Sequence, residues 1–157
     1  MYKYSAKVGE KDACAQGHDW DASYKDLVNI ARAIKNKDVA KARIVLDEAI
    51  ALKHAIRYTK HNTGCGHRSE LGGRKGRYPM KECRLVRKLL ENAVANATGK
   101  GMDESKLMVK SARAFKQNEF PRYRRFWVGS VTLGYGRRAV WANYITSRME
   151  IVVSEKK

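Results

Sequence analysis

The lysines and arginines of this chain are concentrated in two zones that interrupt stretches able to fold conventionally. Residues 57–88 hold ten basic and two acidic residues, and residues 116–157 hold nine basic and three acidic ones. Residues 89–115 carry four basic against three acidic residues, and residues 1–56 carry ten against eight. Because like charges repel, the fold must place both zones at its surface, where a polyanion can neutralise them. The pattern favours a shaped binding surface over a disordered polycation.

The formal charge of the 157-residue chain is +17 at pH 7. Nucleic acid is the commonest partner for such a charge, since each neutralised phosphate releases counterions. An anionic membrane is the alternative, but the sequence shows no apolar run of about 18 residues, no signal-peptide architecture and no lipidation motif. We therefore expect no membrane partner, and a cytosolic protein whose three cysteines are reduced. The length suits one domain with one core.

Apolar spacing predicts three helices. Ser23, with Asp26 three residues later, resembles a capping box and precedes a stripe that predicts a helix over residues 23–36. Asp38 can cap a second helix over residues 39–53. Pro79 suits a first helical position, and the stripe that follows it predicts a third helix ending near Gly99.

Alternation of apolar and polar residues predicts the strands. Leu107–Phe115 and Tyr144–Val153 are expected to pair antiparallel, and Tyr2–Val8 alternates more weakly. The expected fold is α+β, with the three helices packed on a small antiparallel three-stranded sheet.

Residues 57–78 lack an apolar period and contain five glycines, which predicts a long functional loop. His61, Cys65 and His67, with the more distant Cys83, could supply zinc ligands, but their spacing is irregular and there is no CxxC pair. Contact with phosphate is the favoured interpretation, so we expect no metal. No nucleophile, nucleotide-binding or acid–base motif is present, so no enzyme, cofactor or small-molecule substrate is expected.

Residues 116–143 combine aromatic rings with arginines, and we expect them to form a long hairpin protruding from a body of residues 1–115 and 144–157. An isolated two-stranded ribbon is marginal in water, so a partner must surround it. RNA fits, because arginines bind phosphates bidentately and rings stack on bases. A hairpin that folds back to close a barrel is the alternative.

Nine segments resemble, in order, those of the large-subunit ribosomal protein family numbered twenty-two in bacteria and seventeen in eukaryotes. They are Tyr2–Ser5, Ala33–Lys35, Lys60–Asn62, Gly66–Arg68, Gly76–Pro79, Leu89–Ala97, Lys100–Asp103, Gly134–Arg138 and Met149–Val153. The extended basic loop resembles the archaeal and eukaryotic type. Residues 126–133 are more apolar than the family's usual hairpin tip.

The resemblance implies a structural constituent of the large ribosomal subunit, located in cytoplasmic ribosomes, that binds large-subunit ribosomal RNA and supports its folding and assembly. Neighbouring large-subunit proteins would adjoin it, and its hairpin would line the polypeptide exit tunnel. A free architectural DNA- or RNA-binding protein and an RNA-processing enzyme are the alternatives.

The residues expected to bind RNA are basic, aromatic or amide side chains of the loop, the start of the third helix and the hairpin arms. They are Lys60, His61, Asn62, His67, Arg68, Arg74, Lys75, Arg77, Tyr78, Lys81, Arg122, Arg124, Arg125, Arg137 and Arg138. The expected hairpin tip, near the nascent polypeptide, comprises Phe126, Trp127, Val128, Gly129, Ser130, Val131, Thr132, Leu133, Gly134 and Tyr135.

Overall fold

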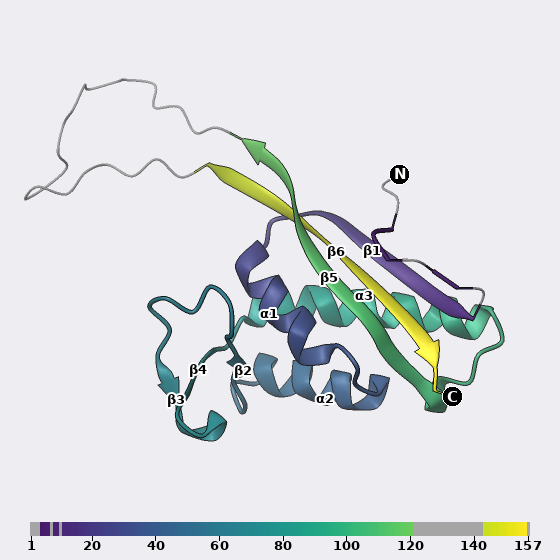
Figure 1. Ribbon diagram of the computed structural model, residues 1–157, viewed down its shortest axis with the longest axis horizontal. Helices are drawn as coiled ribbons and strands as arrows, with labels where there is room; N and C mark the ends of the chain where they lie inside the picture. The colour runs from purple at the N-terminus through teal and green to yellow at the C-terminus, as the bar shows by residue number, and fades with distance from the viewer. Residues whose placement is uncertain (1–3, 7, 10, 121–142, 157) are drawn as a thin grey trace, which may run out of the picture.

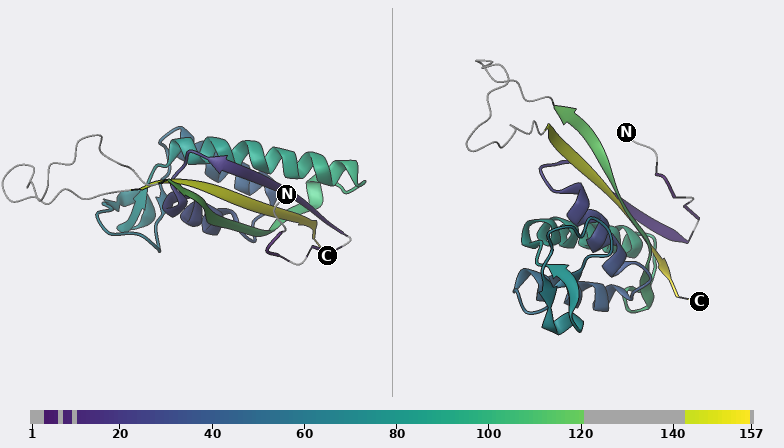
Figure 2. Two further views of the ribbon diagram at one scale, coloured as in Figure 1. Left: turned by 90° about the horizontal axis from the view of Figure 1, so that it is seen from above. Right: turned by 60° about the vertical axis from the view of Figure 1, so that its left-hand side comes forward.

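A three-stranded antiparallel sheet forms the centre of the protein. The computed structural model describes residues 4–6, 8–9, 11–120 and 143–156 (Figure 1). The sheet has the order β1–β6–β5, from β1 (Asp12–Trp20), β5 (Leu107–Phe120) and β6 (Tyr144–Glu155). Three helices gather on one side of it, as the right-hand view of Figure 2 shows. The predicted α+β fold is confirmed.

The helices are α1 (Tyr24–Ile34), α2 (Val39–Ile50) and α3 (Met80–Gly99), close to the predicted ranges. Their apolar stripes meet the inward face of the sheet in one core. Its largest fully buried side chains include Leu27, Ile30, Leu46, Leu90, Met149 and Ile151. Burying a side chain of this kind contributes roughly 1.5–3 kcal/mol, so these stripes supply the main driving force for packing.

Only half of the predicted capping box at the start of α1 forms. The Ser23 hydroxyl accepts a hydrogen bond from the Asp26 amide at 3.4 Å, as expected. The Ser23 amide donates instead to Oε1 of Glu82, on α3, at 3.1 Å. The cap therefore also ties α1 to α3, which a local motif cannot predict.

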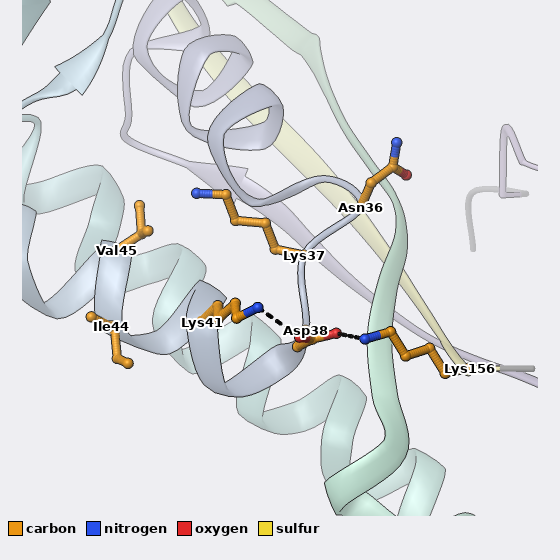
Figure 3. Close-up of a pocket in the computed structure, with 7 residues that line it drawn as sticks. All are labelled: Asn36, Lys37, Asp38, Lys41, Ile44, Val45 and Lys156. Atoms are coloured by element: carbon orange, nitrogen blue, oxygen red, sulfur yellow. Dashed lines mark ion pairs between the residues drawn. The ribbon is translucent and has the colours of Figure 1, made fainter. Parts of the chain in front are cut away.

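Asp38 precedes α2, but its carboxylate makes no hydrogen bond to the amides of the helix. It forms ion pairs with Lys41 at 3.3 Å and with Lys156, next to the C-terminus, at 2.8 Å (Figure 3). These pairs lower the pKa of Asp38, chiefly through the hydrogen bond from Lys156. The α2 helix ends at Ile50 instead of Lys53.

The predicted strand at Tyr2–Val8 is wrong: the described residues within it are not in a strand, and the first strand is β1, at Asp12–Trp20. The inward residues of β1 are small, with Ala13 fully buried and Ala15 6% exposed. They leave α3 room to lie close to the sheet, and they produce no alternation of large apolar residues. That is why the pattern missed the strand.

The predicted pairing of the two long strands is confirmed, and both are longer than predicted. The β5–β6 ladder runs from the Leu107–Glu155 pair to the Phe120–Tyr144 pair, with irregularities after Val109 and after Lys116. The Phe120 and Tyr144 rings lie 5.9 Å apart at the far end. Residues 121–142, which include the expected hairpin tip and the region of the barrel alternative, lie outside the described residues.

The region predicted as a long loop carries a second small sheet. Its strands are β2 (Ile56–Arg57), β3 (His67–Arg68) and β4 (Arg74–Arg77), in the order β2–β4–β3, with a short 3₁₀ turn at Ser69–Leu71. A side chain at position 76 would lie 2.9 Å from the Ile56 carbonyl oxygen, so Gly76 lets β2 and β4 approach. Strands of two to four residues are too short to show a period, so the prediction of a plain loop was wrong.

Candidate nucleic-acid interface

The basic loop, residues 57–78, is fixed to the body by buried polar contacts. Tyr58 is 3% exposed, and its hydroxyl donates to Oδ1 of Asp26 on α1 at 2.8 Å. Burial, and then this hydrogen bond, raise the pKa of Tyr58 well above its usual range. The loop therefore starts from a fixed position on the body.

Asn29 supplies a second attachment from within α1. Its fully buried side chain donates from Nδ2 to the Lys60 carbonyl oxygen at 2.9 Å and accepts the Thr59 and Lys60 amides at 3.2 and 3.3 Å. The Lys60 side chain is left exposed beside it. Since both ends of the Asn29 amide are satisfied, this contact orders the start of the loop.

The small sheet places two arginines directly opposite one another. Arg74 of β4 faces Arg68 of β3, and Lys75 faces His67. Like charges at opposite positions of a ladder destabilise it unless an anion lies between or above them. Arg74 and Arg77 are exposed and Lys75 is half-buried, so their charges are open to a partner.

The cations of the loop differ from those of the helices in their partners. Within the described part of the chain, no ion pair involves Lys60, Arg74, Lys75 or Arg77. The loop's one carboxylate, Glu70, instead accepts hydrogen bonds from the hydroxyls of Tyr78 and Ser69. The Tyr78 hydrogen bond is the main cause that lowers the pKa of Glu70.

Two arginines on α2 and α3 are already paired. Arg43 contacts Glu91 and Glu104, each at 2.7 Å, and Arg87 contacts Asp47 at 3.0 Å and also Glu91. The body therefore neutralises these two arginines itself, whereas the loop keeps positive charge for an external anion.

Several residues expected to bind RNA also make contacts that hold the loop together. Arg68 lies over the Tyr78 ring, 5.1 Å from its centroid, and its Nε donates to the Gly76 carbonyl oxygen at 3.3 Å. The His67 ring bonds the Gly73 carbonyl oxygen. Both Arg68 and Tyr78 are half-buried, so they support β3 and β4 and still reach the surface.

Three more of the residues expected to bind RNA are His61, Asn62 and Lys81. His61 is exposed, with a left-handed backbone at φ 53°, and its ring meets Tyr24 edge-on at 6.0 Å. Asn62 is half-buried, and its carbonyl oxygen accepts the Cys65 amide. Lys81 lies on α3 and pairs with Asp21 at 2.8 Å.

Sequence reasoning missed three further cations. Arg57 on β2 and Arg84 and Lys88 on α3 are exposed and make no ion pair within the described part of the chain. Their place in the first basic zone was the available signal. The hairpin arginines Arg122, Arg124, Arg125, Arg137 and Arg138 lie outside the described residues.

The four candidate zinc ligands do not gather. Among the described residues, no three His, Cys, Asp or Glu side chains form a group that could hold a metal ion. Cys83 is fully buried in the core, and burial, followed by the charges of Glu82 and Asp26, raises its pKa to about 12. Cys65 is buried too, with Sγ 4.0 Å from the His61 carbonyl oxygen. Cys83 is thus part of the core and is not poised as a nucleophile.

The three helices are amphipathic. None of the described helices is both long enough and apolar enough to cross a lipid bilayer.

Comparison with known proteins agrees with this arrangement. The family model described as "Ribosomal protein L22p/L17e" matches residues 15–154. The large ribosomal subunit protein uL22 of Methanosphaera stadtmanae is 41% identical over 107 residues, covering 68% of this chain and 70% of the relative. The uL22 of Archaeoglobus fulgidus is 37% identical over 123 residues, covering 78% and 79%.

A third relative covers almost the entire chain. The uL22 of Thermoplasma volcanium is 33% identical over 156 residues, which is 99% of this chain and 98% of the relative. The family match spans the helices, the basic loop and both long strands, so the resemblance in the sequence is confirmed. The chain belongs to the ribosomal protein L22p/L17e family.

Proposed function

We propose that this protein binds folded RNA of the large ribosomal subunit through its basic loop and hairpin, and so supports folding and assembly of that RNA. Membership of the family makes it a structural, non-enzymatic constituent of the large subunit in cytoplasmic ribosomes. Beyond this, we propose that the basic loop and the hairpin are the surfaces that bind and that large-subunit RNA is what they bind.

The observation that carries the proposal is the Arg68–Arg74 pair across the ladder of the small sheet. The sheet holds these two cations opposite each other at a cost that a bound phosphate would offset. Attachment through Asn29 and Tyr58 gives the loop a fixed shape, so its cations can match a particular array of phosphates.

The hairpin is the second part of the proposal. We infer that residues 116–143 protrude into the RNA, with Arg122, Arg124, Arg125, Arg137 and Arg138 on phosphates, and that the tip lines the exit tunnel near the nascent polypeptide. The described strands support this, because β5 continues beyond the predicted body, from Lys116 to Phe120, and stays paired with β6 as far as Tyr144.

The test of the loop is charge reversal with a matched control. Arg74→Glu with Lys75→Glu is expected to reduce incorporation into large subunits about tenfold or more, since each lost phosphate contact lowers affinity in a salt-dependent way. The control, Lys41→Glu with Lys106→Glu, makes the same change in net charge at lysines that already pair with Asp38 and Asp103. Equal incorporation of both variants would refute the role of the loop.

The hairpin has its own test. Arg124→Glu with Arg137→Glu is expected to impair subunit assembly while the isolated protein stays folded. If assembly and growth are untouched, the hairpin does not bind RNA as proposed.

A further inference from the structure

A hollow of about 400 Å³ lies between α1, α2 and β2. Three cations from separate elements line it: Arg32 of α1, Lys37 of the turn between α1 and α2, and Arg57 of β2. Arg57 and Thr59, which also lines the hollow, belong to the basic loop, so the two surfaces are continuous. None of the residues expected from the sequence to bind RNA lines this hollow.

The three cations have no carboxylate partner. Within the described part of the chain, no ion pair involves Arg32, Lys37 or Arg57, and no aspartate or glutamate lines the hollow. The neighbouring hollow, which shares Lys37, differs because it contains Asp38 and the two lysines that pair with it (Figure 3). The charge of the first hollow is therefore open to an external anion.

Two of the cations are held in position by the fold. The Lys37 carbonyl oxygen accepts the Val109 amide at 2.8 Å, and the Asn36 amide donates to the Val109 carbonyl oxygen at 2.8 Å, which fixes the turn to β5. In Figure 3 the Lys37 side chain extends from this turn into the space between α1 and α2. Arg32 donates from Nη1 to the Thr59 hydroxyl, which uses one of the several donors of its guanidinium.

The base of the hollow is apolar. Ala55 and Ile56, each 2% exposed, form its floor, and the half-buried Ala33, Val45 and Leu71 form its sides. A bare phosphate would gain nothing from such a floor, whereas a nucleobase can bury its flat, weakly polar face there. Cations at the rim and an apolar floor together match one nucleotide with its phosphates.

We propose that an unpaired nucleotide of the bound RNA inserts its base into this hollow, with the adjoining phosphates on Arg32, Lys37 and Arg57. The nucleotide is unpaired because a base inside an RNA helix is stacked and paired, and cannot enter a pocket. The exposed ring of His54, at the rim, stacks on the base.

This inference rests on the proposed function and adds a base pocket to its phosphate contacts. An acidic segment of a protein would also satisfy the cations. RNA is favoured because the hollow is continuous with the basic loop through Arg57 and Thr59, so one RNA can occupy both surfaces.

The test uses cells in which the tagged, full-length chain carries a diazirine amino acid at position 54. Large subunits are isolated at high salt and irradiated, and the cross-linked partner is mapped by primer extension on the RNA and by mass spectrometry of peptides. The expected result is one unpaired nucleotide of the large-subunit RNA. Cross-linking to paired RNA or to a protein segment would overturn the inference, as would no cross-link. Absence of the chain from large subunits would instead contradict the proposed function itself.

Two variants make the result specific to the hollow. Ala33→Trp fills it without changing the charge, and is expected to raise the reactivity of that nucleotide to base-specific chemical probing about fivefold or more. Ala95→Trp, at an exposed position of α3, is the matched control and should leave the reactivity unchanged.

If Ala33→Trp fails to fold, Arg32→Gln with Arg57→Gln removes two exposed cations and is expected to have the same effect. Its control is Lys41→Gln with Lys106→Gln, at lysines that already pair with Asp38 and Asp103. Unchanged reactivity in a folded variant of the hollow would overturn the inference, as would an equal rise in its control.

Discussion

Asn29 of α1 binds the main chain of Lys60 at both its amide and its carbonyl group. The side chain Nδ2 lies 2.9 Å from the Lys60 oxygen, and Oδ1 lies 3.3 Å from the Lys60 nitrogen. The same Nδ2 also donates to the Lys25 carbonyl oxygen at 2.8 Å. One buried side chain in the body therefore sets the position at which the basic loop begins.

Replacing this side chain should loosen the loop as well as destabilise the protein. Asn29→Ala leaves buried main-chain groups unsatisfied and is expected to reduce the free energy of unfolding by about 1–3 kcal/mol. Chemical denaturation measures this change, with Asn92→Ala on the exposed face of α3 as the control. Hydrogen exchange should also show lost protection at the Thr59 and Lys60 amides. If these amides stay protected in the variant, Asn29 does not anchor the loop.

Gly17 makes room for the indole of Trp20. A β-carbon at position 17 would overlap the six-membered ring of Trp20, at the irregularity in the β1–β6 ladder. Gly17→Ala is therefore expected to cost about 1–3 kcal/mol of stability, since the ring must move. Gly66→Ala is the matched control, because nothing lies within 4 Å of its β-carbon. Similar unfolding midpoints for the two variants would contradict the close packing.

Asp12 should make the stability of the protein depend on pH in the acidic range. The residue is 3% exposed, and this burial alone would raise the pKa of its carboxyl group. The carboxylate also accepts hydrogen bonds from Lys110 Nζ, at 2.7 Å, and from the Gly9 amide. These bonds outweigh the effect of burial, so the pKa of Asp12 is lowered. A lowered carboxyl pKa gives stability that is present above the ordinary value of 3.8 and is lost as pH falls through the lower folded value.

The Asp12→Asn variant tests this dependence. It is expected to be less stable than the parent by about 1–3 kcal/mol at pH 7, because Lys110 loses its partner. Denaturation at a series of pH values should show the difference shrinking below pH 3.8, where the Asp12 carboxyl takes up a proton. A difference that is constant with pH would mean that the Lys110 ion pair contributes nothing.

The Cys83 thiol is expected to react slowly with thiol reagents in the folded protein. With a pKa raised by burial from 9.0 to about 12, its thiolate is scarce at neutral pH. In a variant with Cys14→Ser and Cys65→Ser, reaction with a disulfide reagent at pH 8 should be more than about a hundredfold slower in the folded than in the unfolded protein. The raised pKa also means that the stability due to Cys83 is complete below pH 9.0 and falls as pH rises towards 12. Rapid modification of the folded variant would contradict the burial.

The main elements were predictable because large apolar residues mark them. In α3 the stripe from Val86 to Ala97 is buried as expected, and in β6 Met149, Ile151 and Val153 face the core. Strand β1 was missed because Ala13, Ala15 and Gly17 carry no such signal, although their small size is what lets α3 approach. Periodicity reports the size of buried side chains, so it overlooks close packing of small ones.

The candidate interface was predictable in composition but not in geometry. The basic, glycine-rich run at residues 57–78 pointed to phosphate binding, and its unpaired cations agree with that. The Arg68–Arg74 opposition depends on a two-residue strand, and the Asn29–Lys60 contact joins residues far apart in the chain. Local patterns do not contain such long-range pairing, so the sequence could not predict which cations stand together.

Sedimentation tests the central claim most directly. The protein, tagged at its C-terminus, is followed through a gradient of cell lysate at moderate and then at high salt. An integrated constituent held by a shaped RNA interface is expected to travel with large subunits and to remain with them at high salt. A chain that stays at the top of the gradient, or that salt releases, would contradict the account and point to a free nucleic-acid-binding protein.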